Sequence, residues 1–228
     1  MENVTAALQR DRGRLGRSSA AEVVADILRD RIAEGLFVPG QRLSEESIGA
    51  ALEVSRNTLR EAFRLLGHER LLEHRLNRGV FVRVLSAEDV ADLYRMRRVI
   101  EGAAVRNSAH APRDALAAIR EAVTEASRAA DEGRWGDVGT ANIRFHQNLA
   151  ALNGSPRLDE VMRQLLAELR LVFHVMKNPR AFHEPFVLRN LELVELMEAG
   201  RAAEAGQALE IYLDDAEKLL IQAYIPEP

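Results

Sequence analysis

The sequence contains no cysteine and no long apolar run. Without cysteine there are no disulfides and no thiolate metal sites, which is typical of proteins from a reducing compartment. A transmembrane helix needs about 18 or more consecutive apolar residues, so none is expected. The first residues are polar and rich in arginine, with no apolar stretch behind them, so we expect no signal peptide and a cytoplasmic location.

Hydrophobic residues make up 47% of the 228 positions, enough for one large packed domain or two modest ones. The net charge of −4 is unevenly distributed. Residues 1–83 carry 14 Lys and Arg against 12 Asp and Glu, whereas residues 84–228 carry 17 against 23. A basic part joined to an acidic part fits a DNA-binding module joined to a regulatory module.

The first part of the chain has the pattern of short helices followed by a hairpin. Residues 1–17 hold four arginines without a hydrophobic period and are expected to form a flexible basic arm, which could contact phosphates or be a plain mobile terminus. A capping box at Ser19 predicts the start of the first helix. Ser44 and Ser55 are expected to cap two further helices, the last running from Arg56 to about Gly67.

Two alternating segments follow, and a short turn with a glycine joins them. They are centred on Leu72–Leu76 and Val80–Val84, with Asn77-Arg78-Gly79 between them, and they predict a β-hairpin. Two helices about a tight turn, followed by a hairpin wing, make a winged helix-turn-helix. We assign it to residues 18–85.

From Ser86 onward the pattern is helical only. A second capping box at Ser86–Asp89 opens a series of amphipathic segments separated by glycine and proline. They cover about 87–109, 113–131, 137–152, 156–177, 184–199 and 202–222. The fold class is therefore mostly α, and we expect residues 86–228 to form an all-α six-helix bundle.

The third helix carries the most informative chemistry. At 100° per residue its apolar side chains form one stripe and its polar ones the opposite stripe, which holds Arg56, Asn57, Arg60 and Arg64. Such a stripe suits the major groove, where arginine reads guanine and asparagine reads adenine. The hydroxyls of Ser55 and Thr58 suit phosphate, and the wing adds Arg75, Arg78 and Gly79. The alternative is an ordinary solvated helix face; the helix-turn-helix spacing and the basic hairpin favour DNA.

These stretches resemble the DNA-binding domain of the GntR family of transcription regulators. The resemblance covers about residues 19–84 and is carried by Gly35–Glu45, Val54–Ala62, Leu71-Leu72 and Arg78–Val82. It implies that Ser55, Arg56, Asn57, Arg60 and the wing around Arg78-Gly79 contact DNA.

Residues 87–222 resemble the helical ligand-binding domain (FCD type) of the FadR-like branch of that family, through Met96–Glu101, Asn142–Leu149 and Asn153–Leu158. Many members of that branch hold a divalent metal on an Asp and three His. Here only His146 matches, because the other three positions are Asn142, Asn190 and Tyr212, which are poor zinc ligands. We therefore expect no catalytic residues, no cofactor and no tightly bound metal.

A polar cavity can persist without the metal. Arg97, Asn142, His146, Asn190 and Tyr212 would line a partly cationic pocket suited to a carboxylate effector. Three further histidines, His110, His174 and His183, are expected at the surface or in loops.

The sequence predicts a homodimeric repressor that binds operator DNA and is released by a small organic-acid-like effector, with no membrane partner. One alternative is a helical metalloprotein enzyme that uses His146, although no second catalytic residue or known catalytic motif accompanies it. The other is a winged-helix protein-interaction module, which would leave the arginine stripe unused.

Overall fold

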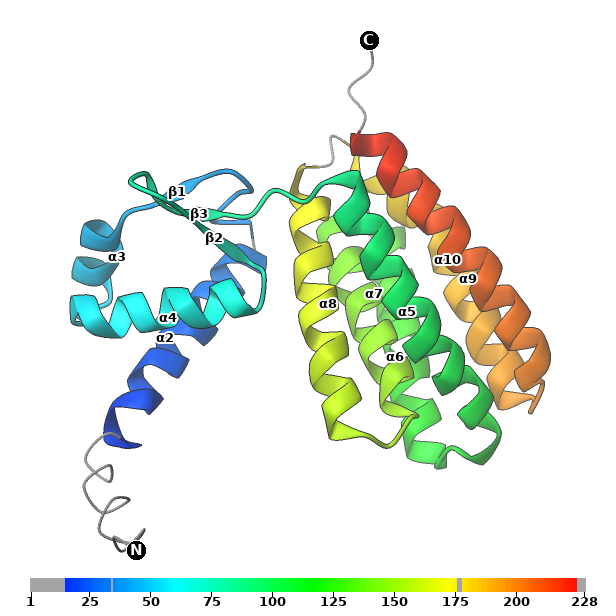
Figure 1. Cartoon of the computed structure of the whole chain (residues 1–228). Coiled ribbons are helices and arrows are strands. Elements are labelled where there is room, and N and C mark those ends of the chain that lie inside the picture. The colour runs from blue at the N-terminus through cyan, green and yellow to red at the C-terminus, as the bar shows by residue number, and fades with distance from the viewer. Residues whose placement is uncertain (1–14, 34, 176–177, 225–228) are drawn as a thin grey trace, which may run out of the picture. The chain divides into compact units, whose positions relative to one another are not determined.

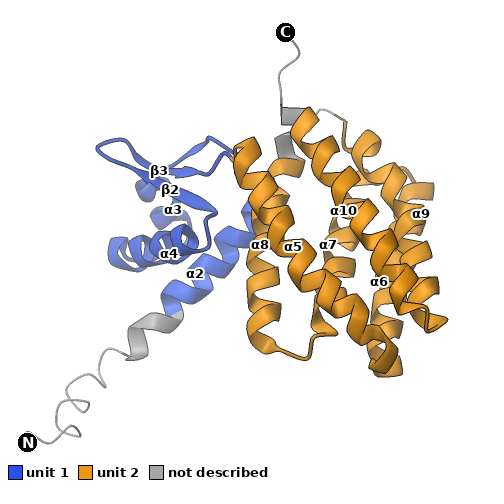
Figure 2. Cartoon of the chain, turned by 45° about the vertical axis from the view of Figure 1, so that its right-hand side comes forward, with its two compact units in different colours: residues 1–84 blue, residues 85–228 orange. Residues whose placement is uncertain are grey.

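The computed structural model describes residues 15–33, 35–175 and 178–224. It divides the chain into two compact units, residues 1–84 and 85–228, which Figure 2 colours separately. The division falls one residue before the predicted boundary between residues 85 and 86.

Unit 1 is a small helical module with a three-stranded sheet. Along the chain it comprises α2 (Leu15–Ala33), β1 (Arg42–Leu43), α3 (Glu45–Ala51), α4 (Arg56–His68), β2 (Leu72–Arg75) and β3 (Gly79–Val82), as Figure 1 shows. The two predicted serine caps are confirmed. The hydroxyl of Ser44 accepts a hydrogen bond from the Ser47 amide at 3.2 Å, and that of Ser55 accepts one from the Thr58 amide at 3.1 Å.

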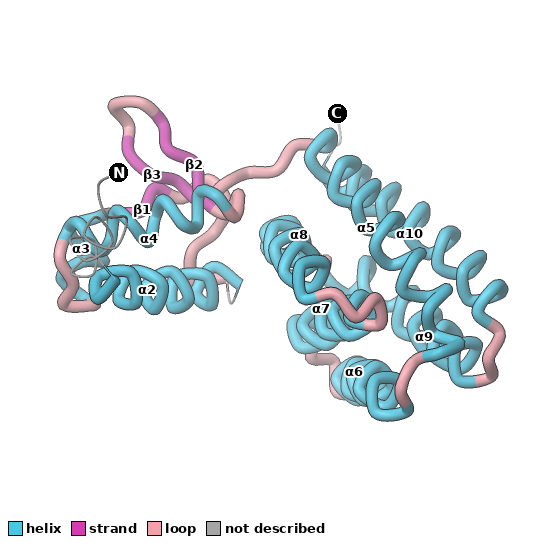
Figure 3. Tube along the Cα trace, turned by 60° about the horizontal axis from the view of Figure 1, so that its bottom comes forward, coloured by secondary structure: helices cyan, strands magenta, loops and turns pink. Residues whose placement is uncertain are grey.

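The wing is confirmed and is larger than the sequence indicated. Strands β2 and β3 pair antiparallel, and Figure 3 shows the loop that joins them. Asn77 in this loop and Gly79 at the start of β3 have φ values of 57° and 102°. A third strand, β1, pairs with the other edge of β3 and places Arg42 opposite Phe81. Two residues are too few to show an alternating pattern, so β1 could not be predicted.

The predicted start of the first helix is wrong. Helix α2 begins at Leu15, four residues before the capping box expected at Ser19, because serine, alanine and arginine continue a helix and no proline interrupts it. Residues 15–17, assigned to the basic arm, therefore belong to α2. The rest of that arm, residues 1–14, lies outside the described residues.

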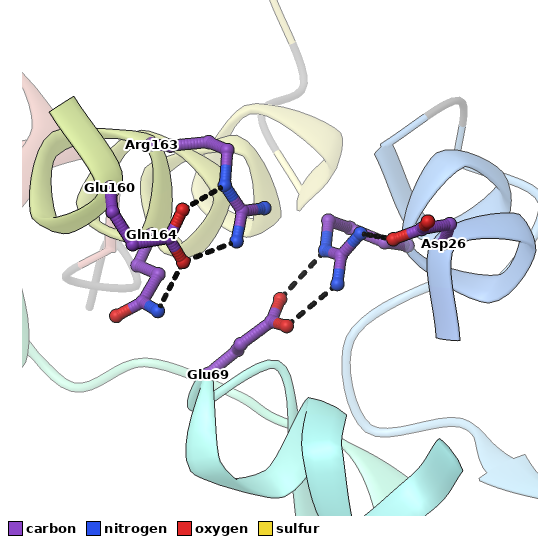
Figure 4. Close-up of polar contacts among 6 residues, drawn as sticks. Asp26, Glu69, Glu160, Arg163 and Gln164 are labelled. Carbon is purple, nitrogen blue, oxygen red and sulfur yellow. Dashed lines mark hydrogen bonds and ion pairs between the residues drawn. The ribbon is translucent and has the colours of Figure 1, made fainter. Parts of the chain in front are cut away.

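An ion pair attaches α2 to the end of α4. The Arg29 guanidinium donates two hydrogen bonds, each 2.6 Å long, to the Glu69 carboxylate. Figure 4 shows Glu69 on one side of this guanidinium and Asp26, a second acceptor, on the other. Arg29 and Glu69 are mostly buried, with side-chain exposures of 17% and 12%. Helix α2 also buries Val24, Leu28 and other apolar residues, and it packs against α4. The pair therefore supplements an apolar contact.

Unit 2 confirms the six-helix bundle. Its helices are α5 (Ala87–Asn107), α6 (Arg113–Asp131), α7 (Trp135–Ala151), α8 (Pro156–Val175), α9 (Pro179–Glu198) and α10 (Ala202–Tyr224), with a short 3-10 turn at Ser108–His110. The predicted capping box at Ser86 and Asp89 opens α5. Helices α5 and α10 lie side by side, as Figure 1 shows. No helix in the described part of the chain is long and apolar enough to cross a membrane.

Helix α9 starts at Pro179 instead of near residue 184. Asn178 caps it, and proline is tolerated at the first helical position. The change places His183 inside the helix, where it is only 3% exposed, so the expected surface location is wrong for this residue. His183 lies against α7 at Gly139, where an added Cβ would come within 2.9 Å of the imidazole. Glycine is needed there for close helix packing.

Candidate functional site

The polar stripe of α4 faces solvent, opposite the buried stripe of Leu59, Ala62, Phe63 and Leu66. Arg56 and Asn57 lie in the first turn of the helix and are exposed, and neither side chain bonds to another described residue. The hydroxyls of Ser55 and Thr58 lie 2.8 Å apart and bond to each other. The start of α4 therefore presents a guanidinium and an amide to solvent, on a rigid helix.

The other two arginines of the stripe are paired with glutamates of the same unit. Arg60 donates to Glu45 of α3 at 3.0 Å, and Arg64 donates two hydrogen bonds to Glu61 at 3.0 and 2.6 Å. All four side chains are at least one-third exposed. Exposed ion pairs contribute only about 0–1 kcal/mol, so a phosphate or base edge can compete for these guanidinium groups.

The wing arginines differ from each other. Arg75 pairs with Glu73, and its guanidinium lies 4.4 Å above the ring of Phe81, so it is held against the sheet. Arg78 lies in the turn and is exposed, without a side-chain partner among the described residues. Gly79 adopts a φ that side chains disfavour, which explains a glycine at this point of the hairpin.

The five residues predicted to line an effector pocket lie together inside unit 2. Each is at least 91% buried, and they come from four helices: Arg97 from α5, Asn142 and His146 from α7, Asn190 from α9 and Tyr212 from α10. His146 Nε2 lies 3.1 Å from the Tyr212 hydroxyl. That hydroxyl lies 3.2 Å from Asn142 Oδ1, which accepts a second hydrogen bond from Asn190 at 2.7 Å.

Glu101 completes this buried polar cluster, and it was not among the predicted site residues. Arg97 Nε donates to one Glu101 oxygen at 2.7 Å, and His146 Nδ1 lies 2.7 Å from the other. The signal was the i, i+4 spacing of Arg97 and Glu101, which places both on one face of a helix. Because the carboxylate offsets the guanidinium charge, the cluster is less cationic than Arg97 alone would make it.

Burial controls the protonation states in the cluster. Desolvation holds the pKa of His146 below its usual value, Glu101 opposes this shift, and Arg97 adds to it. The pKa of Glu101 is also lowered: burial opposes ionisation, but Arg97 and His146 favour it. A neutral imidazole beside an ionised carboxylate follows, so Nδ1 donates to Glu101 and Nε2 carries no proton. The one proton of the Tyr212 hydroxyl can be donated either to this Nε2 or to Asn142 Oδ1, not to both at once.

The residues present do not fit a divalent metal. His146 uses Nδ1 for Glu101, and its Nε2 faces a hydroxyl whose pKa is raised by burial, so Tyr212 is a poor anionic ligand. The Asn142 amide oxygen is engaged by Asn190 and Tyr212. Within residues 15–33, 35–175 and 178–224, no group of three His, Cys, Asp or Glu could hold a metal ion.

Two polar atoms of the cluster are buried without a protein partner: Nη2 of Arg97 and Oδ1 of Asn190. One is a hydrogen-bond donor and the other an acceptor, and buried polar groups are nearly always bonded. A molecule that reached this cluster would have to offer an acceptor to Arg97 and a donor to Asn190.

Comparisons with known proteins agree with this division into two modules. The gntR family of bacterial regulatory proteins matches residues 20–82, and the FCD domain matches residues 92–215. A putative GntR transcriptional regulator from Rhodococcus sp. RHA1 has 49% sequence identity and a TM-score of 0.86, with 91% of this chain and 100% of that chain covered.

Two curated relatives are each 33% identical. They are the Nta operon transcriptional regulator of Aminobacter aminovorans, over 59% of this chain, and a probable D-xylose utilization operon transcriptional repressor of Paenarthrobacter nicotinovorans, over 62%. In both, the match spans 64% of the relative's own length. With a winged helix-turn-helix followed by an FCD domain that covers more than half of it, the chain belongs to the GntR family of bacterial regulatory proteins.

Proposed function

We propose that this chain is a sequence-specific DNA-binding transcription regulator, a repressor that leaves its operator when a small organic acid binds in unit 2. The observation that carries the proposal is the exposed, unpaired Arg56 and Asn57 at the start of a helix whose opposite stripe is buried. That arrangement presents a major-groove reader on a rigid support.

The test uses DNA that the wild-type chain itself selects from a random pool. Arg56→Ala and Arg60→Ala are expected to lower affinity for the selected sequence about 10-fold or more, since a bidentate arginine–guanine contact is worth ~1–3 kcal/mol. Arg70→Ala, at an exposed position two residues beyond the end of α4, is the matched control. Circular dichroism should be unchanged in all three. Wild-type affinity in both the Arg56 and Arg60 variants would contradict the proposal.

For the effector we propose a small carboxylate that binds the buried cluster without a metal. The free Nη2 of Arg97 supports this choice, because guanidinium groups recognise carboxylates. An inducer acts by binding better to the state that does not bind DNA. A thermal-shift screen of organic acids should find a stabilising acid whose effect survives chelation. Stoichiometric zinc or nickel in the purified protein would overturn the metal-free assignment.

We further propose that the regulator is a cytoplasmic homodimer, because a two-fold protein matches a palindromic operator. Val99 and Met96 on α5 are exposed apolar residues, 68% and 41%, and offer a surface for a second copy. Val99→Asp should lower the mass measured by light scattering. An unchanged mass would show that α5 is not part of the dimer interface. The alternative of an enzyme using His146 has no observation in its favour, since both imidazole nitrogens are engaged inside the cluster.

A further inference from the structure

We infer that Arg42 is an additional DNA contact, which binds a phosphate of the backbone beside the wing. The sequence pattern did not indicate this residue, and its role emerges only from strand β1. The inference rests on the proposed function, since it concerns how the same module binds DNA.

Strand β1 fixes where Arg42 lies. Its pairing with β3 sets Arg42 opposite Phe81 and buries the next residue, Leu43, which is 3% exposed. The Arg42 side chain runs along the hairpin to Gly79, where a Cβ would lie only 3.2 Å from the guanidinium Nε. A side chain at position 79 would crowd this guanidinium, so glycine leaves room for it there. The pairing of β1 with β3 therefore places Arg42 beside the turn that carries Arg78.

The charge of Arg42 is available. Its side chain is exposed and has no ion pair or hydrogen bond with any described residue. By contrast, Arg60, Arg64 and Arg75 are each paired with a glutamate of the same unit. A free guanidinium binds a phosphate without first losing an internal partner. Arg42 should therefore contribute to DNA binding at least as much as these three arginines do.

The surroundings of Arg42 suit a DNA strand. Arg42 lines a hollow of about 360 Å³ between the start of α3 and the wing, together with Glu45, Glu46 and Gly79. Glu45 also lines a neighbouring hollow of about 620 Å³, beside Arg60 of the recognition helix. When α4 enters a major groove and the wing reaches the flanking backbone, the strand between them crosses this region. Arg60 offsets the charge of Glu45, whereas Glu46, the second carboxylate of the hollow, is paired with no described residue. Arg42 is then the basic residue of this hollow that can meet the phosphate.

A phosphate contact has a signature that separates it from base reading. Loss of a phosphate contact weakens binding to all DNA sequences alike. It also makes the affinity less dependent on salt, because each phosphate contact adds about 0.9 to the slope of log affinity against log salt concentration. The measurement is fluorescence anisotropy of the full chain with a labelled random-sequence duplex over a salt series. Arg42→Gln should reduce the slope by about 0.9 per bound DNA-binding unit. It should also weaken binding roughly eight-fold at 0.1 M salt.

Arg42→Lys keeps the charge and should keep most of the slope. Arg70→Gln removes one exposed positive charge from the same unit, at the opposite end of β2 from the turn that carries Arg78, and should leave the slope unchanged. Thermal melting checks that all variants fold. A wild-type slope in Arg42→Gln, or an equal fall in Arg42→Gln and Arg70→Gln, would overturn the role of Arg42 and leave the proposed function intact. A wild-type chain that ignored the duplex at low salt would refute both.

Discussion

Replacing Glu101 by glutamine should destabilise unit 2 strongly, because it removes the charge that balances a buried arginine. The Arg97 and Glu101 side chains are 2% and 0% exposed and are joined by a 2.7 Å hydrogen bond. Glutamine has nearly the same shape and can still accept from Arg97 and bond to His146. The substitution therefore isolates the electrostatic loss from the loss of packing.

The magnitude follows from the cost of an uncompensated buried charge. Removing one partner of a buried ion pair costs about 3–5 kcal/mol, against about 0–1 kcal/mol for an exposed pair. In a unit of this size each kcal/mol lowers the melting temperature by roughly 2–4 °C, so Glu101→Gln should melt about 10 °C below the wild type. Replacing both partners, as Arg97→Met with Glu101→Gln, removes the stranded charge and should recover a large part of the loss.

The free energy of unfolding is measured by urea titration of the full chain, with circular dichroism as the signal. The titration is repeated at several temperatures. Asp92→Asn is the matched control, because Asp92 pairs with Arg95 on the same helix but both side chains are more than half exposed. It should change the unfolding free energy by less than about 1 kcal/mol. If Glu101→Gln were as stable as Asp92→Asn, or if the double variant were no more stable than the single one, the reasoning about the buried charge would be wrong.

Three further substitutions test other features. Glu45→Gln frees Arg60 and removes a negative charge beside the DNA strand, so affinity for a random duplex in an anisotropy assay should rise a few-fold. The pKa of His183 is lowered to about 4 by burial and by the charge of Arg170. As the pH falls, this histidine is therefore protonated in the unfolded state before it is protonated in the folded state. Stability should therefore fall by up to about 3 kcal/mol as pH drops from 6.5 to 4, and His183→Gln should flatten this dependence in urea unfolding. Arg29→Ala strands the mostly buried Glu69 and should lower the unfolding free energy of unit 1 by about 1–3 kcal/mol, measured by urea unfolding.

Each of these has a control on the same chain. Glu46→Gln removes a neighbouring carboxylate that is not paired with Arg60, and an equal rise in DNA affinity would show that the Glu45–Arg60 pair is irrelevant. His110→Gln changes an exposed histidine, and the His183 assignment fails if the pH dependence is the same in both histidine variants. Arg95→Ala breaks an exposed pair, and a loss as large as that of Arg29→Ala would contradict the distinction between the two sites.

Helix periods and serine caps predicted most of the fold because they are local signals. Ser44, Ser55 and Ser86 mark helix starts within three residues of the groups they bond, so no distant contact is needed to find them. The start of α2 was missed because Ser19 can cap a helix or continue one, and the local sequence does not decide between the two. Strand β1 was missed since it exists only through its pairing with β3, some 38 residues away.

The candidate sites also combine features that local sequence patterns predict with features that depend on contacts between separate helices. The exposed stripe of α4 could be predicted from its spacing alone, because a buried opposite stripe fixes which way Arg56 faces. The meeting of Asn142, Asn190 and Tyr212 came from the resemblance to a family, since nothing local relates three separate helices. The pairing of Arg60 with Glu45 could not be predicted, because it depends on the angle between α3 and α4.

The two unpartnered atoms of the buried cluster have a thermodynamic consequence for ligand choice. Each buried polar atom without a partner costs about 1–3 kcal/mol, and a molecule that bonds both atoms recovers that loss on entering. A compound that satisfies Arg97 but offers nothing to Asn190 recovers only part of it and should be rejected roughly 5- to 150-fold. At the proposed effector site, selectivity would come from what a wrong molecule leaves unsatisfied, so of two acids that differ by a single hydroxyl only one is expected to act as an inducer.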